Sequence, residues 1–253
     1  MLPRDIVLAL DPARYMEAAG FRPDPWQSTF LRSTATRSLL LCSRQTGKST
    51  TIAALASHVA VYEANALVLL FAPSQQQSRE LFRKVVAFHR DATEDDPEAA
   101  SAQRIELPNG SRIISLSGNP HTARGFSGPR LVIFDEACFG GPSGDELFHS
   151  LTPMLAAGGR FVAMSTPNGK RGWFFDAWEN GGPLWHRTRI TAHDSPRLTP
   201  DFLMAERASK PEWRFRQEYE CEFVETDETL FPADMIARAM SPAVQPIIPD
   251  FAW

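Results

Sequence analysis

The chain has 253 residues, of which 43% are hydrophobic and 22% charged, and its formal net charge is −4. This composition argues against long-range disorder and against nucleic-acid binding through total charge, although a local arginine stripe would suffice for such binding. The three separated cysteines are too few for a disulfide framework or a zinc site, and no apolar run reaches membrane-spanning length. We therefore expect a soluble intracellular protein, with one large core and no membrane partner.

The first part of the chain is predicted to be helical. Helical spacing runs from Asp5 to Ala19 and stops at Gly20. A rigid extended linker follows at residues 21–25, and Pro25 opens a short helix that ends near Ser33.

A polar loop then separates a strand predicted at Ser38–Leu41 from a helix predicted at Lys48–Tyr62. The loop fits the phosphate-binding pattern G-x-x-x-x-G-K-[ST], except that Cys42 stands at the first position, where its Cβ requires a negative φ or some strain. In this pattern backbone N–H groups and Lys48 bind the phosphates of ATP, and the Ser49 hydroxyl binds Mg²⁺. An ordinary Gly-Lys turn is the alternative. The predicted nucleotide-binding residues of the loop are Ser43, Arg44, Gln45, Thr46, Gly47, Lys48, Ser49 and Thr50.

The middle of the chain alternates strands and helices. A buried strand is predicted at residues 66–71 and a helix at 74–90, and an acidic, mobile loop follows at 91–100. Strands at 104–107 and 111–117 flank Pro108-Asn109-Gly110, which is a strong hairpin signal. A polar loop is expected at residues 118–128.

A second motif supports the phosphate-loop interpretation. Residues 131–134 are all apolar, which is typical of a central parallel strand, and Asp135 and Glu136 follow at its carboxyl end. Ligands bind at that edge of open α/β sheets. We expect Asp135 to hold Mg²⁺ through water and Glu136 to polarise the attacking water. Taken alone, the motif would also fit two acids that end a surface strand; together, the two motifs indicate an ATPase.

The remaining elements complete the predicted fold. Further helices are expected at residues 145–155, at 172–178 and twice between 200 and 220, and further strands at 160–165 and 185–190. Strands that alternate with helices predict an α/β fold with a mainly parallel sheet and helices on both faces, here a P-loop NTPase of the ASCE or RecA-like class.

Three further elements are candidate parts of the site. Ser165 and Thr166 end a strand, where a polar residue could contact the γ-phosphate and report its loss; a plain strand end is the alternative. The amide of Gln27 matches the donor–acceptor edge of adenine, but a lone Gln is more often a surface residue. Arg124 could stabilise phosphoryl charge, in its own subunit or in a neighbour's site, or could be a solvated loop residue.

In this order the motifs resemble the ATPase domain of large terminase subunits, which are the DNA-packaging motors of tailed bacteriophages. The resemblance covers residues 26 to about 231. It rests on Trp26-Gln27, an Arg-Gln pair in the phosphate loop that lacks the first Gly, Leu131–Glu136, Ser165-Thr166-Pro167, Arg124-Gly125, and the segment Phe215–Phe223, which ends the family's ATPase domain. The resemblance implies an adenine motif at Gln27, a coupling motif at Ser165-Thr166, and an arginine finger at Arg124 or Arg44.

The resemblance also implies partners and a location. It predicts ATP-driven movement of double-stranded DNA into a viral capsid by a homo-oligomeric ring on the capsid, with a monomer in isolation as the alternative. A portal protein and a small terminase subunit are the implied partners, in the cytoplasm of an infected bacterium. Phosphate contacts without base readout would hold the DNA. The candidate contacts, each of which could equally be an ordinary solvated residue, are Arg79, Arg83, Lys84 and Arg112.

The expected organisation is an ATPase domain with an N-terminal helical segment at residues 1–230, then at 231–253 the start of a linker toward a nuclease domain, so we expect no nuclease activity. A superfamily 2 helicase is the nearest alternative, but it needs a second RecA-like domain. A GTPase would carry an Asn-Lys-x-Asp motif, which is absent from this sequence. A non-catalytic nucleotide-dependent clamp would have no need of Glu136.

Overall fold

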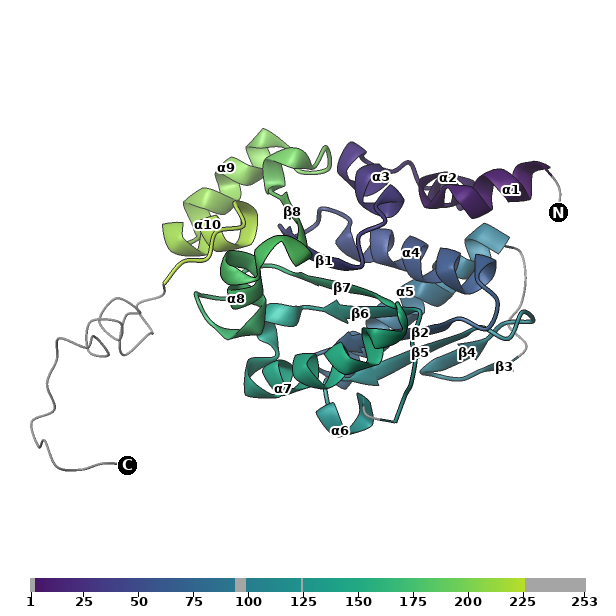
Figure 1. Cartoon of the computed structure of the whole chain (residues 1–253). Coiled ribbons are helices and arrows are strands. Elements are labelled where there is room, and N and C mark those ends of the chain that lie inside the picture. Colours follow the sequence, from purple (N-terminus) through teal and green to yellow (C-terminus); the bar gives the residue numbers. More distant parts are fainter. Residues whose placement is uncertain (1–2, 94–98, 124, 226–253) are drawn as a thin grey trace, which may run out of the picture.

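The computed structural model describes residues 3–93, 99–123 and 125–225. Arg124 and the predicted linker at 231–253 lie outside the described residues, as do residues 94–98 of the predicted acidic loop. Within the described part, eight strands form one sheet in the order β3-β4-β5-β2-β6-β7-β1-β8 (Figure 1).

Six neighbouring strands of this sheet are parallel, and two short strands add an antiparallel edge. The parallel strands are β5 (Arg112–Ser117), β2 (Leu67–Ala72), β6 (Leu131–Asp135), β7 (Arg160–Ser165), β1 (Arg37–Cys42) and β8 (His186–Ile190). The edge strands are β3 (Ala99–Ala100) and β4 (Arg104–Glu106). Strand β7 lies between the phosphate-loop strand β1 and the acid-pair strand β6. The predicted fold class is confirmed.

Helices cover both faces of the sheet (Figure 1). One face carries α4 (Lys48–Tyr62) and α5 (Gln75–Thr93), with α1 (Pro3–Leu10), α2 (Pro12–Ala18) and α3 (Pro25–Arg32) packed beside them. The other face carries α6 (Pro120–Ala123), α7 (Gly141–Leu151) and α8 (Gly172–Asn180). Helices α9 (Pro200–Ser209) and α10 (Glu212–Tyr219) lie at the β8 end of the sheet. Short 3₁₀ turns occur at Ala137–Phe139, Thr152–Ala157, Gly182–Leu184 and Ala192–Asp194.

The core has two layers because successive side chains of a strand point to opposite faces. In β1, Leu40 and Cys42 pack toward α4, whereas Leu39 and Leu41 pack toward α7 and α8. Every residue of β2 is buried, which explains its continuous apolar sequence. A third, smaller cluster joins α9 to α10 through Leu203, Phe215 and Tyr219, together with two residues that precede α9. The last two helices therefore form a small unit of their own.

Several predicted boundaries were wrong. The single helix expected at residues 5–19 is two helices, because Pro12 has no N–H to donate and Asp11 caps α2 by accepting a bond from Ala13 N at 3.0 Å. The helix predicted at 145–155 begins four residues earlier, at Gly141, and ends as the 3₁₀ turn Thr152–Ala157. The polar loop at 118–128 contains the short helix α6, and α5 continues to Thr93.

Candidate nucleotide site

The phosphate loop connects β1 to α4 at the carboxyl edge of the sheet. Cys42 is the last residue of β1 and is fully buried, so the Cβ predicted to need a negative φ is accommodated in extended backbone. Burial also raises the pKa of its thiol, which leaves Cys42 an apolar packing residue. The turn itself is held by a hydrogen bond from the Thr46 hydroxyl to the Ser43 carbonyl, 3.0 Å long.

Gly47 is required at the start of α4 for two reasons. Its φ is +86°, a region that residues with a Cβ rarely adopt. A Cβ there would also lie 2.7 Å from Arg197 Nη2 and 2.9 Å from Gln27 Nε2. The glycine of the motif thus lets two side chains from distant segments approach the loop backbone.

The Gln27 side chain makes internal hydrogen bonds that the sequence did not predict. Its side chain is 1% exposed, its Oε1 accepts a bond from Asp24 N at 2.8 Å, and its Nε2 donates to Thr51 Oγ1 at 2.7 Å and to Gly47 O at 3.3 Å. In this arrangement the amide joins α3 to the first turn of α4. Contact with the adenine edge would require these internal bonds to be replaced.

The acid pair lies opposite the loop and contacts it through Lys48. The Lys48 Nζ atom donates to Glu136 Oε1 at 2.5 Å. Glu136 has φ +49° and ψ +42°, which is left-handed backbone for a residue with a side chain and costs about 1–3 kcal/mol. That strained turn directly follows β6. The turn brings Glu136 into contact with Lys48 of the phosphate loop. This contact agrees with the prediction that the two motifs form one site.

The charges of this trio depend on one another. Burial alone would lower the pKa of Lys48, but Glu136 and Asp135 outweigh it and hold that pKa above its ordinary value. Burial raises the pKa of Asp135, against the opposing effect of Lys48. Asp135 is 8% exposed, and its Oδ1 accepts a bond from Glu136 N at 2.9 Å. A divalent cation beside Asp135 would favour its ionised form.

A cavity of about 390 Å³ opens between these motifs. Its walls include five predicted site residues, which are Arg44, Gln45, Lys48, Glu136 and Thr166. The sequence analysis did not identify three further lining residues, which are Gln77, Phe139 and Tyr219. Gln77 and Phe139 carry no motif of their own, whereas Tyr219 belongs to the segment Phe215–Phe223 noted above. The folding of α5, of the turn after Glu136 and of α10 brings the three residues to the cavity.

The predicted coupling residues connect the acid pair to the last helices. Ser165 Oγ accepts a hydrogen bond from Cys138 N at 3.2 Å, and Asn168 Nδ2 donates to Cys138 O at 3.2 Å. The end of β7 is thus hydrogen-bonded to the turn after Glu136. From there Gly169 N donates to Gln217 Oε1 at 3.4 Å, in α10. A movement at Glu136 therefore has a hydrogen-bonded route to α10.

Helix α10 also contacts the phosphate loop directly. Arg44 N donates to the carbonyl of Glu218 at 3.2 Å, and the Arg44 guanidinium lies 3.6 Å from the Glu218 carboxylate. The Arg44 side chain is 58% exposed and so remains free to reorient. The segment at residues 215–223, which carries part of the family resemblance, therefore lies beside the phosphate loop.

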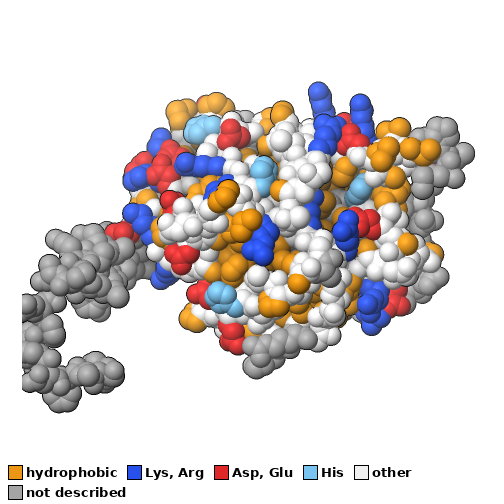
Figure 2. Space-filling model, viewed as in Figure 1, with side chains coloured by type: hydrophobic (Ala, Val, Ile, Leu, Met, Phe, Trp, Pro, Cys, Tyr) orange, Lys and Arg blue, Asp and Glu red, His pale blue; other side chains and the backbone are white. Residues whose placement is uncertain are grey.

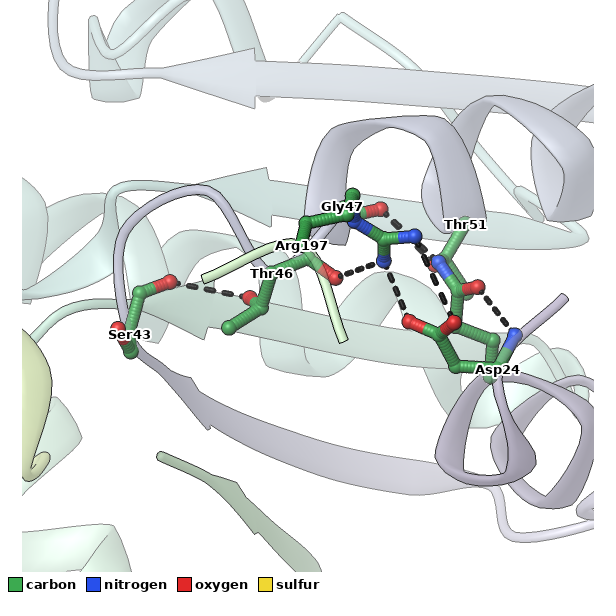
Figure 3. Close-up of polar contacts among 7 residues, drawn as sticks. Asp24, Ser43, Thr46, Gly47, Thr51 and Arg197 are labelled. Carbon is green, nitrogen blue, oxygen red and sulfur yellow. Dashed lines mark hydrogen bonds and ion pairs between the residues drawn. The ribbon is translucent and has the colours of Figure 1, made fainter. Parts of the chain in front are cut away.

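Arg197 was not predicted, yet its guanidinium bonds directly to the backbone of the phosphate loop (Figure 3). Its Nη2 donates to Thr46 O at 2.8 Å and to Asp24 Oδ2, and its Nη1 lies 3.5 Å from Asp24 Oδ1. The Asp24 side chain is 8% exposed. Three distant segments, before α3, after β1 and before α9, thus meet at one guanidinium. Their sequence separation left no local signal for this contact.

The predicted DNA contacts do not share one surface. Arg79 and Arg83 lie on α5 and line a cavity of about 450 Å³, together with Arg90. Arg112 alternates with Ile113, which packs toward α5, so Arg112 belongs to the opposite face of the sheet. Lys84 is exposed on α5, and its charge contributes to the field at Asp135. In the view of Figure 2 basic side chains are interspersed with acidic ones. The four residues therefore do not form a single DNA surface, and DNA contact by any one of them stays a prediction.

Residues 39–238 match the family described as "Terminase large subunit, T4likevirus-type, N-terminal". The chain belongs to this terminase family. A terminase large subunit of Escherichia phage T5 is 30% identical over 194 residues, which are 72% of this chain and 42% of that protein. The chain thus spans less than half the length of this curated relative.

Solved terminase structures share the fold. The large terminase ATPase domain of Thermus phage P74-26 superposes with a TM-score of 0.71 at 23% identity, and the match covers 83% of this chain and 98% of that one. A large terminase from another thermophilic bacteriophage, solved in complex with ADP, gives 0.60 at 11% identity, covering 83% of this chain and 53% of that one. The family resemblance inferred from the motifs is confirmed.

The terminase site fits a nucleotide with Mg²⁺. The loop backbone around Gly47, the buried Lys48 and the cavity beside them provide the donors, the cation and the space that a triphosphate needs. Among the described residues, no group of three or more His, Cys, Asp or Glu side chains could hold a metal ion. Ser49 and Asp135 would hold Mg²⁺ as Mg²⁺ is usually held, with one or two protein ligands, water and phosphate oxygens.

Proposed function

We propose that this chain hydrolyses ATP to drive double-stranded DNA into a viral capsid. The observation that carries the proposal is the contact between Lys48 and Glu136 at the carboxyl edge of the sheet. A phosphate-binding lysine and a water-orienting carboxylate can meet there only if both motifs belong to one site. Membership of the terminase family supports the DNA-packaging context, and the ADP complex of the thermophilic phage terminase supports adenine nucleotide as the ligand.

The residues divide the chemical work as follows. Lys48 and the amides of Thr46, Gly47 and Ser49 would bind the phosphates, and Ser49 and Asp135 would hold the metal, which neutralises phosphate charge when bound. Phosphate oxygens would compete with Glu136 for Lys48, and the released carboxylate would orient water. Arg44, or Arg124 from a neighbouring subunit, would stabilise the charge on the transferred group, an effect of about 10³–10⁵ in rate.

Hydrolysis would be transmitted through the contacts that already link the site to α10. Ser165 and Asn168 hold the turn after Glu136, and Gly169 bonds to Gln217. We propose that loss of the γ-phosphate shifts this series of contacts and so moves α9 and α10. The proposed partners are duplex DNA, a portal protein, a small terminase subunit and further copies of this chain in a ring. The proposed location is the cytoplasm of the infected bacterium. Among the residues that the structure describes, no helix could cross a membrane.

Turnover with and without duplex DNA tests the proposal. We expect phosphate release with ATP and Mg²⁺, faster turnover when duplex DNA is added, and a steep loss of that stimulation as salt rises. Glu136→Gln is the catalytic control. ATP binding without turnover under any DNA condition would instead indicate a clamp, and stimulation by single strands only, with duplex unwinding, would indicate a helicase.

A further inference from the structure

A second polar cavity lies at the other edge of the sheet. It has a volume of about 390 Å³ and is bounded by the residues between α3 and β1, by α4, and by the residues that precede β6 and β7. The nucleotide site lies at the carboxyl ends of these parallel strands, and this cavity lies at their amino ends. With strands of five or six residues, the two sites are about 20 Å apart along the sheet.

Three arginines line this cavity, and two of them have carboxylate partners. Arg32 pairs with Asp11 at 2.8 Å, and Arg130 pairs with Glu63. Arg160 has no carboxylate partner among the described residues, and its Nε is buried without a hydrogen bond. Within the described part of the chain, the one hydrogen bond of its guanidinium is a long bond of 3.4 Å from Nη2 to Phe30 O, beside a cation–π contact with the Phe30 ring at 5.1 Å.

This arrangement leaves one partly buried positive charge without a carboxylate partner among the described residues. Burial lowers the pKa of Arg160 to about 10, so the group is still charged at neutral pH. His58 also lines the cavity, but burial lowers its pKa and it adds no charge at neutral pH. A buried cation without a partner is unfavourable, and its natural complement is an anion.

We propose that this cavity binds a phosphate group through Arg160. A planar guanidinium with free N–H donors matches the oxygens of a phosphate, and three residues with short hydroxyl side chains, Ser33, Thr34 and Thr36, also line the cavity. The cavity is also of the size that holds small ligands. The phosphate could be free, as an ion or a mononucleotide, or could belong to a DNA backbone at the cavity mouth.

Occupation of this site would bear on the nucleotide site through α3. Arg160 contacts the carbonyl of Phe30 in the last turn of α3, and Gln27 in the first turn of the same helix holds α4 and the loop. An anion that draws Arg160 away from Phe30 would release the end of α3.

The test uses the full chain with Lys48→Ala, because that background removes phosphate binding at the nucleotide loop. Binding of inorganic phosphate is followed by calorimetry and by ³¹P line broadening. We expect one site, with binding weakened about tenfold or more by Arg160→Met and partly retained by Arg160→Lys. Arg37→Met, at the start of β1 and outside this cavity, is the matched control and should bind as the background does.

Two further measurements distinguish a loss of phosphate binding from misfolding of the Arg160→Met variant. Ala35→Phe should fill the cavity from its wall and block phosphate while Arg160 stays in place. Without phosphate, Arg160→Met should melt no lower than the background, because an uncompensated buried charge is removed. Undetectable phosphate binding by the background overturns the proposal. So does unchanged binding by a folded Arg160→Met protein that melts lower, since Arg160 would then be a structural cap of α3.

Competition distinguishes the two sources of the phosphate. If a short DNA duplex displaces inorganic phosphate, and Arg160→Met removes that competition, the site takes a backbone phosphate. If mononucleotides displace it and the duplex does not, the site takes a free phosphate compound.

Discussion

The Lys48 ammonium and the Glu136 carboxylate form an ion pair with a separation of 2.5 Å, although 88 positions separate them in the chain. Both side chains are largely buried, at 13% and 24% exposure. The lysine that should hold phosphate thus neutralises the carboxylate that should orient water. In the proposed function a nucleotide would have to break this pair to bind, so we expect nucleotide binding to release Glu136.

Glu136→Gln should therefore separate binding from hydrolysis. The amide is a weaker partner for Lys48 and cannot take a proton, so we expect ATP to bind at least as tightly while turnover falls about 10²–10⁴-fold. Lys48→Ala should instead lose ATP binding. Calorimetry and single-turnover hydrolysis measure the two effects, and near-normal turnover by Glu136→Gln would remove it from the catalytic role.

Arg197 should act on the nucleotide loop together with Asp24. Arg197→Ala and Asp24→Asn each loosen the contact at Thr46, so each should raise the KM for ATP more than it lowers kcat. Because the two residues share one contact, the double variant should be little worse than either single variant, with a coupling of about 0.5–3 kcal/mol.

The control for this pair is Arg14→Ala, which removes an exposed ion pair within α2 that does not touch the loop. Its KM should equal that of the native chain. Fully additive effects of Arg197→Ala and Asp24→Asn would show that the two residues act separately.

Gln27→Ala should test the two roles considered for that residue. Because the amide is buried and bonded to Asp24, Thr51 and Gly47, we expect lower thermal stability and weaker binding of ATP and GTP by similar factors. Competition binding measures the ratio of the two affinities. A selective loss of ATP preference would restore Gln27 to the adenine edge, as the sequence predicted.

The arginine finger remains a prediction from sequence, because Arg124 lies outside the described residues. If Arg124 acts in a neighbour's site, the isolated chain should hydrolyse ATP faster as its concentration rises. A mixture of Arg124→Ala with Glu136→Gln should then recover part of the activity, since some interfaces would combine an intact finger with an intact acid. A mixture that assembles but stays inactive, with turnover lost in Arg44→Ala, would assign the finger to Arg44.

His58 should make stability depend on pH. Burial lowers its pKa from the ordinary 6.5, while its Nε2 donates to Leu8 O at 3.0 Å and so ties α4 to α1. Below that ordinary value the unfolded chain takes up a proton that the folded chain resists, so the stabilisation present above it is lost as pH falls through the lowered pKa.

His58→Gln keeps a donor for Leu8 O and removes the titration. Between about pH 7.5 and about pH 5 its melting temperature should fall less than that of the native chain. The exposed His186 provides the control, and His186→Gln should follow the native curve. Identical pH profiles for the native chain and His58→Gln would show that His58 does not titrate in this range.

The sequence by itself determined the fold class and the main chemical groups of the site. Continuous apolar strands such as residues 67–72, and the polar residues at their carboxyl ends, are local patterns that depend on neighbours in the chain. For this reason the positions of the phosphate loop, of the acid pair and of the polar strand end at Ser165 and Thr166 could all be predicted. The predicted helix boundaries were wrong where a single residue interrupts an otherwise helical pattern. Pro12 is an example, because it has no N–H to donate and so divides the predicted first helix into α1 and α2.

Only the tertiary structure decided which distant groups share the site. Arg197 reaches Asp24 and Thr46 across 173 and 151 positions, and Arg160 reaches Phe30 across 130. Such contacts leave no periodicity, because they depend on where whole elements pack rather than on the spacing of residues within one element. The same holds for Gln27, whose amide joins α3 to α4, and for Arg112, which strand alternation turns to the other face of the sheet.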